Sequence, residues 1–406
     1  MGKKLMLAVA LVALMAAPAF ASVQNVKVGG DLKTTSVIRN NFTNAGLSVG
    51  QDSQNVILSQ IGLNVQADLT DNVSTTLRLN NERIWGPETS TNTDIKLDAA
   101  YVTMKEMLYS PLTVVLGRQP LVYGNQFLIG DVNTYGAADV STVSDLTGGV
   151  NADAIKAILT YDPLTVDLFA AKISTGTPST TALNGDDDAD LYGINANYKV
   201  GDSMNTVLEA YTFAKFDKEV ATTTTKTKKL YVPGLRVSTN PIEGLNVQLE
   251  GAYQAGNDAD NVTISAYGLQ AGVNYALPVM KNMKPVLSAG YTYLSGDKNT
   301  GDNKDTSFDS LYENQNSGRI FDVVATSTSN IKIATIAAEV TPIQDVTTKL
   351  SVYNLNLVKK GTANARVGNE VDLDVTYAYT EDVKFGLSAG VFLLNQLHEI
   401  RINLTL

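Results

Sequence analysis

The sequence contains 406 residues, of which 44% are hydrophobic, 18% charged and 7% aromatic, with no Cys and one His. The lack of Cys excludes disulfide frameworks, Cys-ligated zinc, iron–sulfur clusters and thiol nucleophiles. A single His excludes a multi-His metal site and argues against a Ser-His-Asp triad. The net charge of −10 argues against nucleic-acid binding, which requires clustered Lys and Arg. We therefore expect a protein that is not an enzyme and holds neither metal nor cofactor.

The N-terminus has the three parts of a secretory leader. Two lysines at residues 3–4 precede an apolar run at residues 5–17, and an A-x-A sequence follows at residues 19–21. Together these features predict a cleaved Sec signal peptide at residues 1–21. The apolar run is too short to cross about 30 Å of hydrocarbon as a helix. We expect residues 22–406 to form one mature domain.

Apolar and polar residues alternate over many segments of the mature sequence. From Ile57 to Leu69 the odd positions are mostly apolar and the even positions mostly polar. Residues 245–254, 371–380 and 400–406 repeat this pattern. A period of two is typical of strands with one apolar and one polar face, and no comparable segment repeats at 3.6 residues. In chain order, these signals predict about eighteen strands, near residues 24–39, 55–69, 73–84, 94–106, 111–119, 152–161, 164–173, 190–200, 205–216, 228–239, 244–254, 262–276, 284–295, 331–340, 346–357, 370–380, 383–393 and 397–406.

The connections between these strands alternate in length. Turn-like connections such as residues 70–72 and 161–163 alternate with mostly longer polar ones such as residues 124–150 and 296–330. This alternation is typical of a bacterial outer-membrane barrel, with short periplasmic turns and long extracellular loops. The sequence therefore predicts an all-β fold, a transmembrane antiparallel up-and-down β-barrel of about eighteen strands, with sixteen also compatible. An even number of strands places both termini in the periplasm.

Two further observations bear on the barrel. A soluble β-sandwich would also alternate, but a chain of this length should then divide into domains, and no linker or change of composition is present. Membrane barrels carry aromatic girdles at both interfaces. The sequence has 18 Tyr but only one Trp, so we expect the girdles to consist largely of tyrosines near strand ends: Tyr101, Tyr161, Tyr198, Tyr231, Tyr293 and Tyr379.

Several short motifs in the same order resemble a known family. Val115–Pro120 contains a Gly-Arg-Gln sequence, Asp153–Lys156 opens the next hairpin, and Phe308–Tyr312 and Gly368–Leu373 follow later. Together these motifs, which are scattered over residues 57–393, resemble the alginate-export family of outer-membrane porins. The resemblance implies an eighteen-stranded barrel that passes a solute by diffusion, with a monomer favoured and a trimer also possible.

Charged residues on the polar strand faces are the candidate functional residues. The resemblance implies an Arg-rich lumen, but here basic positions such as Arg236 are balanced by acidic ones such as Glu209 and Glu250. No field that focuses polyanions is therefore predicted. Strand parity points Arg118 toward lipid, so a bulge or the strand end must redirect it. The expected pore-lining residues are Arg78, Glu82, Arg118, Asp153, Lys156, Asp372 and Asp374.

Two other features are expected to be structural. Asp186, Asp188 and Asp190 form a D-x-D-x-D sequence, but no closing Glu follows at the spacing of a calcium loop, so we expect a solvated acidic loop. The single histidine, His398, lies on the lipid-facing parity of the last strand. The sequence has no Gly-x-Ser-x-Gly elbow, so an outer-membrane hydrolase is not expected.

Together these patterns predict an outer-membrane channel of a Gram-negative bacterium, giving passive diffusion or export of small hydrophilic solutes, including anionic or saccharide ones. The alternative is a non-conducting structural or adhesion barrel. The expected partners are outer-membrane lipid and lipopolysaccharide, diffusing small solutes, periplasmic chaperones and the barrel-assembly machinery. No nucleic-acid partner is expected.

Overall fold

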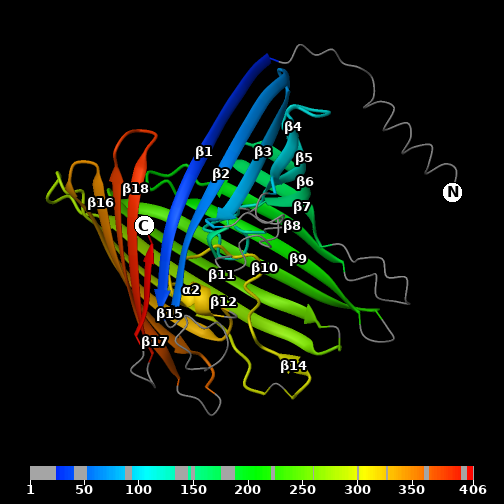
Figure 1. The fold of residues 1–406 in the computed structure, drawn as a ribbon. Helices are drawn as coiled ribbons and strands as arrows, with labels where there is room; N and C mark the ends of the chain where they lie inside the picture. Colours follow the sequence, from blue (N-terminus) through cyan, green and yellow to red (C-terminus); the bar gives the residue numbers. More distant parts are fainter. Residues whose placement is uncertain are drawn as a thin grey trace.

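The protein is a single antiparallel β-sheet that curves around an interior, as Figure 1 shows. The computed structural model describes residues 24–40, 53–86, 94–132, 145–147, 151–174, 188–220, 225–258, 260–299, 301–325, 328–360, 365–394 and 400–405. Its strands are β1 (Gln24–Asn40), β2 (Ser53–Thr70), β3 (Val73–Ile84), β4 (Lys96–Met104), β5 (Leu112–Pro120), β6 (Asn151–Tyr161), β7 (Leu164–Ser174), β8 (Ala189–Lys199), β9 (Val207–Val220), β10 (Thr225–Ile242), β11 (Leu245–Asn257), β12 (Thr263–Ala276), β13 (Val286–Leu294), β14 (Lys304–Asp305), β15 (Ile331–Ile343), β16 (Val346–Leu357), β17 (Arg366–Ala378), β18 (Lys384–Leu394) and β19 (Ile400–Thr405).

The strands follow an up-and-down order. Each long strand pairs antiparallel with its neighbour in the chain, and β13 pairs with β15 across the two-residue β14. β1 pairs with β2 along its length and with β19 at four positions, Val37–Asn40 against residues 402–405. The eighteen long strands confirm the predicted barrel class and strand number.

Two short elements lie in the long connection between β13 and β15 and were not predicted. β14 pairs parallel with β12, and the single-turn helix α2 spans Phe321–Val324. Neither has the length or the residue period that would mark it in a sequence. Among the described residues, no helix is long and apolar enough to cross a membrane.

The two faces of the sheet follow the predicted parity. On β2, the odd-numbered Ile61 and Leu63 are exposed, whereas the even-numbered Leu58 and Gln60 point inward and are buried. On β11, Leu249 and Tyr253 are likewise exposed, whereas the even-numbered residues point inward. The outer face is therefore apolar, as a lipid-facing surface requires.

Aromatic side chains gather at both ends of the outer face. At the end with the long loops, Phe216 lies 5.7 Å from Tyr192 and 5.7 Å from Tyr231 between ring centroids. At the other end, Tyr377 stacks on Phe385. These clusters agree with the expected girdles. Tyr101 is an exception, because its register with Thr76 on β3 places it on the inner face.

Part of the inner face near the long loops is apolar, although the alternation predicts a polar inner face. Phe169, Phe213, Leu230 and Phe392 point inward and are buried in one cluster with residues of the long loops. The reason is that two of these loops fold back inside the barrel and pack against the wall in place of water.

Candidate functional site

Two loops form one body inside the barrel: inner loop A (residues 121–132) and inner loop B (residues 306–325). The backbone amide of Tyr312 in loop B donates to the Leu128 carbonyl at 2.9 Å, and Gly130 N donates back to the Tyr312 carbonyl at 2.8 Å. Phe127 and Phe308 stack with their ring centroids 5.9 Å apart. Because backbone bonds and ring contacts join them, the two loops narrow the lumen together.

Inner loop B is attached to a row of three carboxylates on β17. Glu370 accepts hydrogen bonds from the backbone amides of Ile320 at 2.6 Å and Phe321 at 2.9 Å. Asp372 accepts one from the amide of Arg319 at 3.0 Å, and the Arg319 guanidinium pairs with Asp374. The three carboxylates occupy alternate positions, so they share the inner face. We call them the β17 carboxylate row.

Gly318 allows the close approach of loop B to β17. Its φ is +128°, a conformation that L side chains rarely adopt. A Cβ at this position would lie 2.6 Å from Oε2 of Glu370. A side chain here would therefore both strain the backbone and push the loop away from its anchoring carboxylate.

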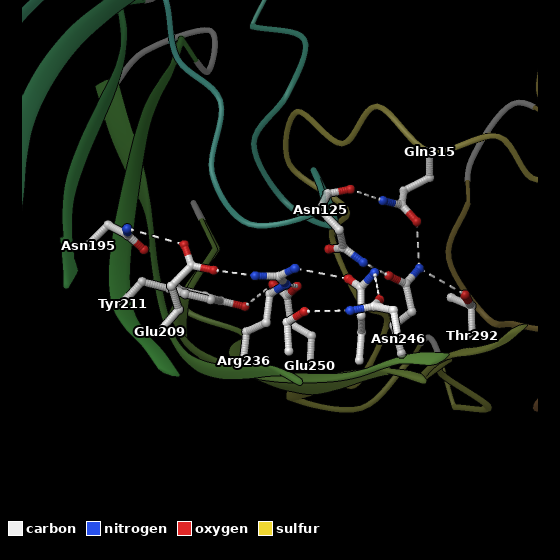
Figure 2. Close-up of polar contacts among 12 residues, drawn as sticks. Asn125, Asn195, Glu209, Tyr211, Arg236, Asn246, Glu250, Thr292 and Gln315 are labelled. Carbon is white, nitrogen blue, oxygen red and sulfur yellow. Dashed lines mark hydrogen bonds and ion pairs between the residues drawn. The ribbon is translucent and has the colours of Figure 1, made fainter. Parts of the chain in front are cut away.

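A cluster of amides attaches both loops to the opposite wall, as Figure 2 shows. The side chain of Asn125 in loop A donates to Gln270 on β12, and Gln315 of loop B donates to the Asn125 backbone carbonyl. Gln270 in turn donates to Thr292 Oγ1 on β13 at 3.2 Å. These contacts involve neutral groups, so this side of the constriction is polar without being charged.

Arg236 on β10 organises the charged part of this wall. It donates to Glu209 on β9 at 2.7 Å and to Gln248 on β11 at 2.9 Å. Its Nε lies 3.8 Å from Oε2 of Glu250, whose other oxygen accepts a 2.8 Å bond from the Tyr211 hydroxyl. Figure 2 shows these side chains in one continuous network. Register explains the cluster, because Arg236 lies directly opposite both glutamates.

A polar cavity lies between the inner loops and the wall formed by β11 to β16. Its volume is about 360 Å³, and its lining consists mainly of amide, hydroxyl and small side chains. Only two charged residues, Glu250 and Lys349, contribute to it among the described residues. A larger hollow of about 1410 Å³ is lined mainly by apolar and aromatic residues of β8 to β13 and lies on the outer face, so it belongs to the lipid side. The smaller cavity is the candidate site.

Five of the expected pore-lining residues lie on the inner face. Arg78 pairs with Asp31 at 2.7 Å and Asp98 at 2.9 Å. Glu82 accepts hydrogen bonds from Gln60 and Thr147, both at 2.6 Å. Lys156 shares the inward parity of the buried Ala154, and Asp372 and Asp374 belong to the β17 carboxylate row.

The other two, Arg118 and Asp153, lie on the outer face. Arg118 donates to both oxygens of Asp153, at 2.9 and 2.7 Å. Asp153 has the parity of the exposed Ile155, whereas Ala152 and Ala154 beside it are buried inside. The inward redirection expected at Arg118 therefore does not occur. The expectation that Arg118 and Asp153 line the pore was wrong, because both lie on the outer face. Both residues are near strand ends, where a charge on the lipid side costs least.

The acidic sequence at the start of β8 also pairs with lysines. Asp188 and Asp190 lie 3.0 and 2.9 Å from Nζ of Lys172, and Lys218 lies 3.6 Å from Asp188. These lysines take the place that a cation would occupy. Asp186 and His398 lie outside the described residues. In the described part of the chain, no group of three or more His, Cys, Asp or Glu could hold a metal ion.

The sequence reasoning missed Arg236, Glu209 and Glu250 as a unit, although it placed each on a polar face. It also missed Asn125 and Gln315, because nothing in a loop sequence tells whether the loop folds inward. The available signal was an apolar residue at an inward position, such as Phe169 or Phe213, which requires a partner inside the barrel.

Comparison with known proteins identifies the family. The family model described as "Alginate export" matches residues 24–394, nearly the whole chain. The chain belongs to the alginate-export family. This confirms the resemblance found in its motifs, and it places this family member in the outer membrane of a Gram-negative bacterium as a channel for small solutes. No curated protein matches the chain significantly.

Solved structures show the same fold at low sequence identity. OpdQ from Pseudomonas aeruginosa is 12% identical with a TM-score of 0.59, covering 95% of this chain and 98% of its own. A BenF-like porin from Pseudomonas fluorescens Pf-5 is also 12% identical, with a TM-score of 0.57 and the same coverage. OccK2 (OpdF) from P. aeruginosa, solved in complex with glucuronate, is 12% identical with a TM-score of 0.56 and again 95% and 98% coverage. Each similarity concerns the barrel fold.

Proposed function

We propose that this alginate-export family member is a passive channel whose passage is narrowed by inner loops A and B. The observation that carries the proposal is that both loops are attached to the inner wall and leave a polar cavity beside them. A barrel satisfies its backbone in lipid, and polar inward residues provide an aqueous path. Solutes would therefore pass along the wall of β11 to β16 and be selected by size and polarity at the constriction.

The charges at the constriction support moderate selectivity. Arg236 is paired with Glu209, and Arg319 with Asp374, while Glu250, Glu370 and Asp372 leave the named acidic groups in excess. Paired charges of this kind set a local field without attracting a polyanion strongly. A structural neighbour was solved with glucuronate, so small acidic saccharides belong in the first set of solutes to be tested.

We further propose that the protein has no enzymatic activity and works as a monomer. Removal of residues 1–21 would precede delivery by periplasmic chaperones to the barrel-assembly machinery. The support for this route is the leader-like N-terminus and the barrel itself.

Single-channel conductance of the refolded mature protein in planar bilayers tests the proposal. We expect discrete, stable conductance steps that increase when loop B is released from β17. Reversal potentials in a KCl gradient would give the charge preference. A correctly folded barrel that never conducts would contradict the channel and favour the structural or adhesion barrel.

A further inference from the structure

The wall of the polar cavity carries unused hydrogen-bonding groups. Asn274 on β12, Ser288 on β13, Thr335 on β15 and Lys349 on β16 all line it from inward positions. None of their side chains has a hydrogen-bond or ion-pair partner among the described residues. Register places Asn274 directly opposite Ser288, so two of these groups form one patch. Together they offer both donors and acceptors to a solute.

The charges around this patch nearly cancel. Lys349 is flanked by Glu339 on β15 and Asp374 on β17, which occupy the directly opposite register positions. Side chains at such positions have Cβ atoms about 4.5–5.5 Å apart, so both carboxylates reduce the field of the lysine. Glu250 lies against Arg236 in the same way. The cavity therefore lacks the positive field that would draw in a carboxylate.

The remaining lining favours hydroxyl groups. Amide side chains of Gln248, Gln270 and Gln315 line the other side of the cavity. A hydroxyl both donates and accepts, so it can satisfy amides, hydroxyls and an ammonium group alike. The volume of about 360 Å³ is at the lower end of the range of about 300–1,000 Å³ for small-molecule sites.

We propose that this cavity is a binding subsite for an uncharged, hydroxyl-rich solute of mono- or disaccharide size, and that it discriminates against the corresponding carboxylates. The inference rests on the proposed channel function and narrows its solute class. Passing solutes would exchange water for the free groups of Asn274, Ser288 and Thr335. The two carboxylates opposite Lys349, and Glu250 beside Arg236, leave no net positive charge that would compensate a carboxylate for its lost hydration.

Interruption of the channel current by added sugar tests this subsite. Maltose and glucuronate are added in turn to the reconstituted wild-type channel, and the half-blocking concentration of each is measured. We expect maltose to block at a concentration at least about fivefold lower than glucuronate. The Thr335→Val variant keeps the side-chain shape but loses the hydroxyl, so its half-blocking concentration for maltose should rise about threefold or more.

Thr165→Val is the matched control, because Thr165 lies at an inward register position on β7, away from the cavity. Maltose should block this variant at the same concentration as the wild type. The inference would be overturned if glucuronate blocked the wild-type channel at an equal or lower concentration than maltose, or if Thr335→Val left the half-blocking concentration of maltose unchanged.

Equilibrium dialysis of labelled maltose against the detergent-solubilised barrel separates this inference from the channel function. Saturable binding that Thr335→Val weakens supports the subsite even in a barrel that does not conduct. Conductance without saturable maltose binding would retain the channel and eliminate the subsite.

Discussion

Glu370 on β17 accepts two hydrogen bonds from consecutive backbone amides, those of Ile320 and Phe321, where inner loop B enters α2. One carboxylate therefore holds the start of this helix against the wall, although the two segments are about fifty residues apart in sequence. Arg319 reinforces the attachment through the neighbouring Asp372 and Asp374.

Glu370→Gln should loosen inner loop B, because an amide offers only one accepting oxygen where the carboxylate offers two. Hydrogen bonds to charged groups contribute about 1.5–3 kcal/mol each. We expect more frequent transitions to a larger conductance level in single-channel records. Glu339→Gln is the control, since Glu339 is an inward carboxylate of β15 without a hydrogen bond or ion pair to the described residues of the loop. Identical gating in both variants would contradict the attachment.

Arg236→Met should shift the channel toward cations. The substitution leaves Glu209 and Glu250 without their shared basic partner. Breaking a buried pair in this way costs about 3–5 kcal/mol of stability, so the unfolding midpoint in urea should fall as well. Reversal potentials measure the first effect. Lys199→Met removes the same charge near the periplasmic end of β8 and should leave both quantities nearly unchanged.

Reversal potentials can test whether Arg118 and Asp153 lie on the outer face. Arg118→Gln should leave the reversal potential at its wild-type value, because the side chain does not face the lumen. Arg78→Gln should move it toward cations, because Arg78 lies on the inner face between Asp31 and Asp98. A selectivity change of equal size in the two variants would place Arg118 in the pore after all.

Gating should depend on pH through Glu313 in inner loop B. Burial raises the pKa of this carboxyl, and the nearby Asp131 adds to the rise. The 2.6 Å hydrogen bond donated by the backbone amide of Gln315 opposes it. A carboxyl whose pKa is raised in the docked loop stabilises docking at pH values below its ordinary pKa. This stabilisation is lost as the pH rises through the pKa of the docked state. We therefore expect more open time as pH rises above about 4.5. Glu313→Gln should flatten that dependence in open-probability measurements.

The strands could be predicted because alternation is a local property of the sequence. Residues 73–84 were expected and observed as β3, and residues 346–357 as β16. Ends differed where pairing continues beyond the alternating segment, as in β10, which extends to Thr225 and pairs there with Val220 of β9. Strand parity also gave the face of most charged residues correctly.

The constriction could not be predicted to the same extent. Asn125 and Gln315 meet across nearly two hundred residues, and only the packing of two loops inside the barrel brings them together. The alternation of the strand correctly predicted that Arg118 points outward. The further expectation that a bulge or the strand end would turn it inward was wrong. Its ion pair with Asp153 satisfies both charges where they are, so no rearrangement is required.

The seam between β1 and β19 is much shorter than the pairing of β1 with β2. Among the described residues, four register positions join these strands, whereas β1 and β2 share fifteen. Fewer hydrogen bonds have to break there for the wall to separate. Residues 27–36 of β1 have a partner strand on the β2 side alone among the described residues, whereas Val37–Asn40 are paired on both sides, so the amides of residues 27–36 should exchange with deuterium before those of Val37–Asn40. A cross-link across this short seam should slow thermal unfolding more than one between β1 and β2.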